Sequence, residues 1–281
     1  MTIVRTALIQ STAHREFEPN FEQIGGLVRK AAAGGAEFIL TPENVTMLEP
    51  KRDMALAKAR SEADHPGIGF FADLARETNT HLLAGSLSIK TEGGKLHNRS
   101  YLFAPDGSVI AKYSKIHLFD VDLPSGETYR ESNTFAPGDQ AVIAQTPFGL
   151  VGLTICYDVR FPQLYRMLAQ AGASILTVPA AFTRVTGVAH WQILLQARAI
   201  ETGCFVLAPA QTGEHAEGRT TYGHSLIIAP WGEVLADAGE DVGYIIADLD
   251  LAKVAEARGR VPSLRHDRPF AGPGSLEAAA E

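Results

Sequence analysis

The sequence predicts an α/β fold in which helices cover a mixed sheet. Short apolar segments typical of buried strands alternate with segments whose apolar residues recur at helical spacing. Two other segments contain pairs of strands joined by turns with Pro and Gly, which favours hairpins. Because β-α-β units give parallel strands and hairpins give antiparallel strands, the two signals together predict a mixed sheet.

The first β-α-β unit lies in the N-terminal part of the chain. Residues 3–10 alternate like a strand, residues 20–35 carry apolar side chains at helical spacing and end in Gly, and residues 37–40 form a short apolar strand. The same rhythm returns further along. The later elements are a helix at 70–79, a strand at 81–90, a strand at 149–156, a helix at 161–173, a strand at 174–180, a helix at 190–203 and a strand at 204–210.

Two hairpins are predicted at residues 101–113 and 226–238. They share the pattern A-P-x-G-x-V-[IL]-A, at Ala104–Ala111 and Ala229–Ala236. The repeat indicates either two similar halves of one domain or a common turn signature met twice. The residues alone leave both interpretations open.

One compact domain is predicted over residues 1–259. No Ser-rich linker, charge block or low-complexity stretch divides this part of the chain. Residues 260–281, with scattered Arg and Pro, are predicted to form an extended C-terminal arm. Arms of this kind pack on another surface, and a second subunit is one candidate.

The composition excludes several classes of partner. The 281 residues are 46% hydrophobic and carry a formal net charge of -7, which argues against nucleic acid and anionic membrane because such binding needs clustered Lys and Arg. The N-terminal segment lacks the features of a secretory signal, and no apolar run approaches the ~20 residues that span a bilayer, so we expect a cytoplasmic protein. Two cysteines are too few for a disulfide framework and should be free thiols.

Each thiol has its own explanation. Cys156 ends the apolar run GLVGLTIC and precedes a helix with Pro162 near its first turn, so it lies at a strand-to-helix elbow. In open α/β folds this edge of the sheet is where ligands bind. A buried structural role is the ordinary one for a free cysteine, and Cys204, inside the apolar strand CFVLAPA, is assigned to it.

Two charged residues also follow predicted strands. Glu43 comes after EFIL, and Lys115 comes after SVIAKY. Taken singly, each is typical of a solvated loop charge. Together with Cys156 they supply a nucleophile, a carboxylate base and a cation for developing negative charge, which are the groups that acyl transfer requires.

The segments around these residues resemble a known family. TPEN at Glu43, YSKIHLFDVDLP at Lys115 and LTICYDVRFPQL at Cys156 are similar to the three signature regions of the nitrilase, or carbon-nitrogen hydrolase, superfamily, in matching order, and the resemblance extends over nearly the whole chain. It implies an αββα four-layer sandwich with mixed sheets, a Glu-Lys-Cys catalytic triad and a homodimer or larger homo-oligomer. Glu131, in YRESNTFAPG, matches a second glutamate that lies beside the lysine and helps to position substrate.

The resemblance also implies a mechanism. Cys156 attacks an amide carbonyl and forms a thioester, Glu43 transfers protons, and Lys115 holds the oxyanion together with the backbone N–H of Tyr157. A nearby cation or helix N-terminus is expected to lower the pKa of the Cys156 thiol. No cofactor is implied, and the nine His residues show no HExxH or other paired-ligand spacing for a metal.

The expected substrate is a small-molecule amide, cleaved with release of ammonia. The segment AQTGEH favours the branch that acts on deaminated glutathione, and the alternative is an ω-amidase acting on 2-oxoglutaramate or another dicarboxylate monoamide. A true nitrilase is less favoured, because YDVRFPQL resembles the amidase form, and so is an inactive binding member of the fold. Since these amides bear carboxylates, Arg160, Arg184 and Arg219 are candidate anion partners, although structural ion pairing is the commoner role of such residues.

Overall fold

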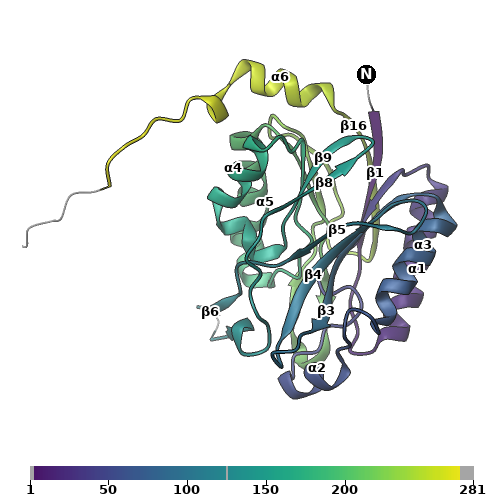
Figure 1. The fold of residues 1–281 in the computed structure, drawn as a ribbon. Helices are drawn as coiled ribbons and strands as arrows, with labels where there is room; N and C mark the ends of the chain where they lie inside the picture. Colours follow the sequence, from purple (N-terminus) through teal and green to yellow (C-terminus); the bar gives the residue numbers. More distant parts are fainter. Residues whose placement is uncertain (1–2, 125, 273–281) are drawn as a thin grey trace, which may run out of the picture.

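The computed structural model describes residues 3–124 and 126–272, and two six-stranded sheets form its centre (Figure 1). In the first sheet β1, β2 and β3 are parallel, whereas β16, β4 and β5 pair antiparallel with their neighbours. In sheet order its strands are β16 (Gly243–Asp250), β1 (Ile3–Gln10), β2 (Phe38–Leu40), β3 (His81–Lys90), β4 (Leu96–Phe103) and β5 (Val109–Ser114).

The second sheet repeats this plan. Its central strands β9, β10 and β11 are parallel, and β8, β14 and β15 pair antiparallel with their neighbours. In sheet order the strands are β15 (Val234–Asp237), β14 (Leu226–Ile228), β11 (Phe205–Ala208), β10 (Ile175–Thr177), β9 (Gly149–Leu153) and β8 (Val142–Thr146). The predicted mixed pairing is therefore confirmed, in two sheets.

Helices cover the outer face of each sheet. Helices α1 (Phe17–Ala33) and α3 (Pro66–Thr78) lie on one side of the molecule, and α4 (Pro162–Gln170) and α5 (Arg184–Thr202) lie on the other (Figure 1). The two sheets face each other between these helix pairs. The arrangement is the expected αββα sandwich of four layers.

Alternation along β1 shows how the layers are held together. Leu8 belongs to the apolar cluster between the two sheets, which also contains Val151 of β9. Its neighbours Ala7 and Ile9 belong to a separate cluster beneath the first helix pair, with Ile24 of α1. Because successive side chains of a strand point to opposite faces, one short apolar strand contributes to both interfaces.

The two halves of the chain have matching topology. Read as β16-β1-β2-β3-β4-β5 and β8-β9-β10-β11-β14-β15, the two sheets have the same sequence of parallel and antiparallel pairs. The hairpins β4–β5 and β14–β15, which contain the repeated sequence pattern, occupy equivalent positions. The structure therefore favours the interpretation of two similar halves over that of a turn signature met twice.

Several elements were not predicted. Apart from β16, which has eight residues and several apolar side chains, they are short or carry few apolar residues, so that their periodicity is weak. Besides β8 and β16, they are α2 (Arg52–Lys58), β6 (Asp120–Asp122), β7 (Thr128–Arg130), β12 (Thr212–Glu214), β13 (Thr220–Tyr222) and α6 (Ala252–Arg260).

Three helices begin earlier than predicted. Helix α1 begins at Phe17 and α5 begins at Arg184. Helix α3 begins at Pro66, directly after His65, whose ring accepts a hydrogen bond of 3.1 Å from the backbone N–H of Gly67. Proline suits the first helical position because its missing N–H would have no partner there, so the start of α3 is readable from the sequence after all.

The end of the domain and the predicted arm meet at α6. This helix spans residues 252–260 and so crosses the predicted boundary at 259. Beyond it, Ser263 and Asp267 accept hydrogen bonds from Arg166 of α4, and Phe270 is 92% exposed. Figure 1 shows this part of the chain leaving the body of the molecule after α6. Residues 273–281 of the predicted arm lie outside the described residues.

No helix within residues 3–124 and 126–272 is both long enough and apolar enough to cross a membrane.

Candidate active site

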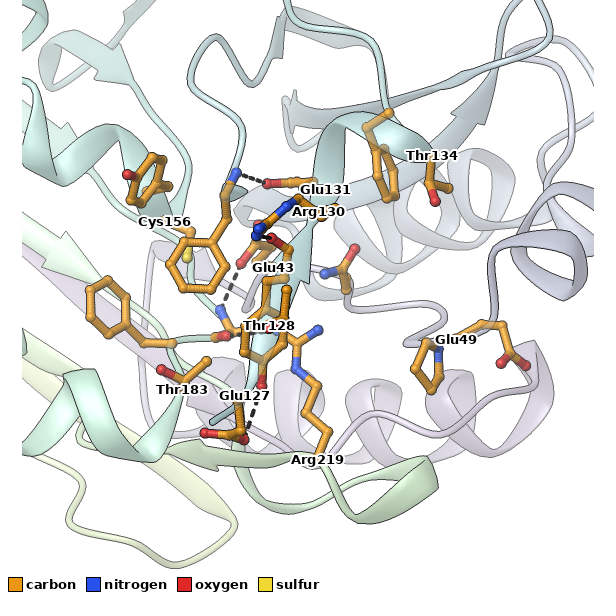
Figure 2. Close-up of a pocket in the computed structure, with 18 of the residues that line it drawn as sticks. Glu43, Glu49, Glu127, Thr128, Arg130, Glu131, Thr134, Cys156, Thr183 and Arg219 are labelled. Atoms are coloured by element: carbon orange, nitrogen blue, oxygen red, sulfur yellow. Dashed lines mark hydrogen bonds between the residues drawn. The ribbon is translucent and has the colours of Figure 1, made fainter. Parts of the chain in front are cut away.

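Three predicted site residues meet where strands of the two sheets end, and Figure 2 shows Glu43 and Cys156 among them. Glu43 follows β2, Lys115 follows β5, and Cys156 follows β9. The Nζ atom of Lys115 lies 2.9 Å from Oε1 of Glu43, and the Cys156 thiol lies close enough to the same carboxyl group for each to shift the pKa of the other. All three residues are buried, and Cys156 is the most exposed of them, at 7%. The structure thus brings a thiol, a carboxylate and an ammonium together.

Both oxygens of Glu43 are held by donors. Oε1 accepts a hydrogen bond of 2.8 Å from the side-chain amide of Asn98, and Oε2 accepts one of 2.8 Å from the backbone N–H of Ala181. Burial acts to raise the pKa of Glu43, but the charge and hydrogen bond of Lys115 outweigh it and lower the pKa below the ordinary value. The carboxyl group is therefore ionised at neutral pH and ready to accept a proton.

Glu131 lies on the other side of the lysine, as the family resemblance implies. Its two carboxylate oxygens accept hydrogen bonds of 3.1 Å and 2.9 Å from Lys115, and Oε2 also accepts one of 2.7 Å from the backbone N–H of Phe119. Burial acts to lower the pKa of Lys115, but the charges of Glu131 and Glu43 outweigh it and raise the pKa well above the ordinary value. Lys115 therefore stays charged although it is buried.

The backbone at Cys156 explains why its thiol faces the site. The residue has a φ of 48°, in the left-handed region that side chains other than glycine rarely adopt. Its N–H donates to the carbonyl of Pro179 at 2.9 Å, and the short 3-10 helix Cys156–Arg160 begins at this residue. This turn joins β9 to α4 and projects the thiol from the elbow predicted by the sequence.

The pKa of the Cys156 thiol differs from the expectation. Burial raises it well above the ordinary value, the carboxylate of Glu43 raises it further, and Lys115 offsets only part of this shift. The prediction of a lowered pKa was wrong because it considered the cation and not the burial or the adjacent carboxylate. The raised pKa favours the protonated thiol at neutral pH.

Asp158 ties the cysteine elbow to the lysine loop. Its Oδ2 atom accepts hydrogen bonds from the Tyr113 hydroxyl at 2.7 Å and from the backbone N–H of Ile155 at 2.9 Å. Its Oδ1 atom lies 3.1 Å from the backbone nitrogen of His117 and 2.7 Å from the His117 ring nitrogen Nδ1. Tyr113 and His117 flank Lys115, so one fully buried carboxylate fixes the backbone on both sides of the site.

The triad opens into a cavity of about 450 Å³ (Figure 2). Tyr157, which follows the cysteine, lines this cavity together with Phe119, Tyr129 and Phe182. A backbone N–H in the first turn of a helix has no partner within that helix, so the N–H of Tyr157 is suited to hold an oxyanion beside Cys156. Its aromatic walls and the buried charges make the cavity a site for a partly apolar, partly charged ligand.

The three candidate anion partners lie in different places. Arg219 lines the cavity. Arg184 is exposed and forms two hydrogen bonds of 3.0 Å with Glu240, which is the structural ion pairing that the sequence had favoured. Arg160 lies over the ring of Tyr157, with 5.8 Å between its guanidinium carbon and the ring centroid, and is not among the residues lining the cavity.

The second thiol is held apart from this chemistry. Cys204 is fully buried, lies 3.2 Å from the carbonyl oxygen of Ala173 and receives a contact of 3.0 Å from the Arg258 guanidinium. It does not line the cavity. In the part of the chain that the structure describes, no group of three or more His, Cys, Asp or Glu side chains is placed to hold a metal ion.

Sequence reasoning missed Asn98, Ala181 and Asp158. Asn98 lies among the polar residues His97, Arg99 and Ser100 of β4, so nothing local showed that it would be buried. Ala181 contributes through its backbone, for which no side-chain signal exists. Asp158 was visible as a charged residue two positions after the predicted nucleophile, but nothing local showed that it would be buried.

Known proteins and a family model match nearly the whole chain. The family model described as carbon-nitrogen hydrolase matches residues 5–259. A protein from Synechocystis sp. named deaminated glutathione amidase is 44% identical over 92% of this chain and 96% of its own length. A human protein named omega-amidase is 36% identical over 95% of this chain and 96% of its own length.

Solved structures show the same fold. The crystal structure of the C. elegans NitFhit protein superposes with a TM-score of 0.89 at 36% identity. The match covers 95% of this chain and 65% of the C. elegans chain, so this chain spans about two thirds of that protein's length.

Proposed function

Because this chain belongs to the carbon-nitrogen hydrolase family, we propose that it is a cysteine-dependent amidase whose substrate is deaminated glutathione. The observation that carries the proposal is the grouping of Cys156, Glu43 and Lys115 at the cavity, in a chain that is 44% identical to a deaminated glutathione amidase over nearly all of both sequences. The grouping of the three residues supports the reaction type, and the sequence identity supports the substrate.

The chemistry of this substrate decides its products. In deaminated glutathione the side-chain carbonyl of the former glutamate is joined to the cysteine nitrogen, so the molecule has no primary amide. Its hydrolysis there releases cysteinylglycine and 2-oxoglutarate. The predicted release of ammonia therefore applies to the alternative substrate, 2-oxoglutaramate, whose amide is primary. Both substrates pass through the same 2-oxoglutaryl thioester on the enzyme.

In the proposed acylation step, the proton of the Cys156 thiol passes to Glu43 while the sulfur attacks the amide carbonyl carbon. The carbonyl electron pair moves to oxygen, and this oxyanion is stabilised by the Lys115 ammonium and the backbone N–H of Tyr157. Glu43 then gives its proton to the departing nitrogen as the C–N bond breaks. The raised thiol pKa and lowered carboxyl pKa support a thiol and a carboxylate as the resting forms.

In the proposed deacylation step, Glu43 takes a proton from a water molecule that attacks the thioester carbonyl. The C–S bond breaks, and the thiolate recovers the proton from Glu43. Glu131 takes no part in bond making in this scheme. It keeps Lys115 charged and fixed between two carboxylates, as their contacts of 2.9 Å support.

The alternative function is that of an ω-amidase, which the 36% identity to the human protein supports. The test is a side-by-side measurement of kcat/KM for deaminated glutathione, 2-oxoglutaramate, acetamide and one aliphatic nitrile. Deaminated glutathione is expected to give the highest value, and acetamide to be a poor substrate because it offers the rest of the cavity nothing to bind. If kcat/KM for 2-oxoglutaramate exceeded that for deaminated glutathione by more than about 10-fold, the alternative would replace the proposal.

The same proposal includes a homodimer or larger homo-oligomer in the cytoplasm. Ile193 and Ile200, seven residues apart and so on one side of α5, are 69% and 59% exposed, and Trp231 at the neighbouring β14–β15 turn is 51% exposed. Exposed apolar groups of this kind support an interface between subunits. Light scattering of the purified chain should give at least twice the monomer mass. The substitution Ile193→Glu should lower the measured mass.

A further inference from the structure

The basic residues that line the cavity differ in whether an acidic side chain balances their charge. Lys115 is paired with two glutamates, as described above. Arg130 donates to both carboxylate oxygens of Asp122, at 2.7 Å and 2.9 Å. Arg219 forms no ion pair with any residue in the ranges 3–124 and 126–272. Its charge is therefore the one in this set that the described protein does not already balance.

The guanidinium of Arg219 has a hydrogen-bond donor without an acceptor among the described residues. Its Nη2 atom donates to the carbonyl of Ala181 at 3.1 Å, and its buried Nε has no hydrogen-bond partner among the described residues. The ring of Tyr129 lies against it, with 5.5 Å from the guanidinium carbon to the centroid. A buried donor without an acceptor is costly, and a guanidinium presents paired N–H groups that match a carboxylate. The side chain is suited to bind a carboxylate inside the cavity.

The backbone holds Arg219 in place for this task. Its carbonyl accepts a hydrogen bond of 2.7 Å from the N–H of His215. The His215 ring is itself buried between the carbonyl of Ala13, at 3.0 Å, and the hydroxyl of Thr221, at 2.7 Å. Because the loop is fixed without a ligand, binding would not require ordering it, which favours affinity.

The distance from Glu43 is compatible with binding of the carboxylate at the acyl end of the substrate. The N–H of Ala181 bonds Glu43 at 2.8 Å and its carbonyl bonds Arg219 at 3.1 Å, so one residue of backbone separates the two side chains. They can therefore lie no more than roughly 10 Å apart. A five-carbon acyl chain covers such a span, whereas the glycyl carboxylate of deaminated glutathione lies on the leaving-group side of the scissile bond. Figure 2 shows Arg219 on the wall of the same cavity as Glu43 and Cys156.

We propose that Arg219 binds the carboxylate at the acyl end of the substrate, the group that stays in the site when the thioester has formed on Cys156. The inference rests on the proposed function and specifies it further: the subsite selects acyl groups that end in a carboxylate and is indifferent to the leaving group. Arg219 is thus a specificity-determining residue shared by deaminated glutathione and 2-oxoglutaramate.

The kinetic test compares Arg219→Gln with wild type on three amides: deaminated glutathione, 2-oxoglutaramate and pentanamide, which has the five-carbon chain without the carboxylate. The variant should lose at least about 30-fold in kcat/KM on both carboxylate substrates, by the same factor, as expected when one partner of a buried charge pair is truncated. The already low rate with pentanamide should change by less than about 3-fold, since that substrate never uses the pair. Arg219→Lys should retain part of the lost activity.

Two variants serve as matched controls. Arg184→Gln removes an exposed arginine that is ion-paired outside the cavity, and it should leave all three rates unchanged. Arg160→Gln removes the arginine stacked behind Tyr157 and should not discriminate between substrates with and without the carboxylate. If Arg160→Gln produced the selective loss and Arg219→Gln did not, the proposal would be overturned.

Other outcomes also decide the matter. A loss confined to deaminated glutathione would place Arg219 on the leaving-group side and overturn the proposal, and an equal loss on all three amides would reduce Arg219 to a structural role. Calorimetric binding of 2-oxoglutarate, the common product, gives a readout without turnover. If wild type hydrolyses neither carboxylate amide but binds 2-oxoglutarate in an Arg219-dependent way, the proposed substrate fails and the carboxylate subsite stands. Equal binding to wild type and Arg219→Gln would overturn the subsite.

Discussion

The Lys115 ammonium lies 2.9 Å from the Glu43 carboxylate and 2.9 Å from the Glu131 carboxylate; Lys115 and Glu43 are buried, and Glu131 is mostly buried. Each charge is tolerable there only because the others are present, since an isolated buried ion loses several kcal/mol of hydration. The cluster therefore links stability to the arrangement of the site, and its members cannot be removed singly without cost.

Lys115→Met should destabilise the fold by about 3 kcal/mol or more at pH 7, because it leaves two carboxylates facing each other without their cation. Urea denaturation measures the change in the free energy of unfolding. Lys112→Met is the matched control, since Lys112 lies in β5, the strand that precedes Lys115, and is 54% exposed, so its loss should change stability by no more than about 0.5 kcal/mol. Adding Glu43→Gln to Lys115→Met should restore part of the loss, and a purely additive result would argue against the coupling.

Cys156 should be alkylated slowly at pH 7 to 8 and faster as the pH rises. Burial, and then the charge of Glu43, raise the pKa of its thiol, so the native state keeps a proton that the unfolded chain releases in the ordinary thiol range. The raised thiol pKa also links stability to pH. The contribution of Cys156 to the free energy of unfolding is complete below the thiol pKa of the unfolded chain, and it declines as the pH rises through that value.

Glu43→Gln should speed this alkylation at pH 8 while lowering turnover, because it removes a negative charge that opposes the thiolate and leaves Lys115 in place. Iodoacetamide labelling followed by mass spectrometry gives the alkylation rates of wild type and variant. Cys204, fully buried, is the internal control and should stay unlabelled in both proteins. Slower labelling of Cys156 in the variant would mean that Glu43 lowers the thiol pKa instead.

Cys156→Ala should abolish amide hydrolysis, whereas Cys204→Ala should leave kcat nearly intact and affect only stability. The reason is that Cys156 faces the cavity and Cys204 is enclosed between Ala173 and Arg258. Product formation by equal amounts of folded protein is the measurement. Comparable losses in the two variants would assign the wrong role to at least one cysteine.

Asp158→Asn should lower kcat by about 10-fold or more with little change in KM, because an amide nitrogen cannot accept the hydrogen bonds that hold the cysteine elbow and the lysine loop. Tyr113→Phe removes only one of these bonds and should have a smaller effect on kcat. Steady-state kinetics of the two variants beside wild type tests this, and an unchanged kcat for Asp158→Asn would exclude the positioning role.

The strands that lead to the site were readable from the sequence because they are apolar. The runs before Glu43 and Cys156 are continuous buried segments bounded by turn residues, and β2 and β9 match them to within three residues. The positions of these two residues beyond the strand ends follow from the same pattern. Their contact with each other does not, since it depends on how one sheet packs on the other.

The remaining walls of the cavity could not be predicted for a different reason. Tyr129 and Arg219 come from the short hairpins β6–β7 and β12–β13, whose three-residue strands have no usable periodicity. Helix α6 was missed because only Val254 and Ala257 are buried in it, so it lacks an apolar stripe. These elements owe their conformation to tertiary contacts that no local pattern records.

The thiol and its base come from different sheets, Cys156 from the end of β9 and Glu43 from the end of β2. A small slide of one sheet over the other would part them while every strand kept its own hydrogen bonds. Turnover is therefore a finer gauge of inter-sheet alignment than circular dichroism, which reports the strands alone. A void opened far from the cavity, at Leu8 between the sheets, would lower turnover before it changed the circular dichroism spectrum.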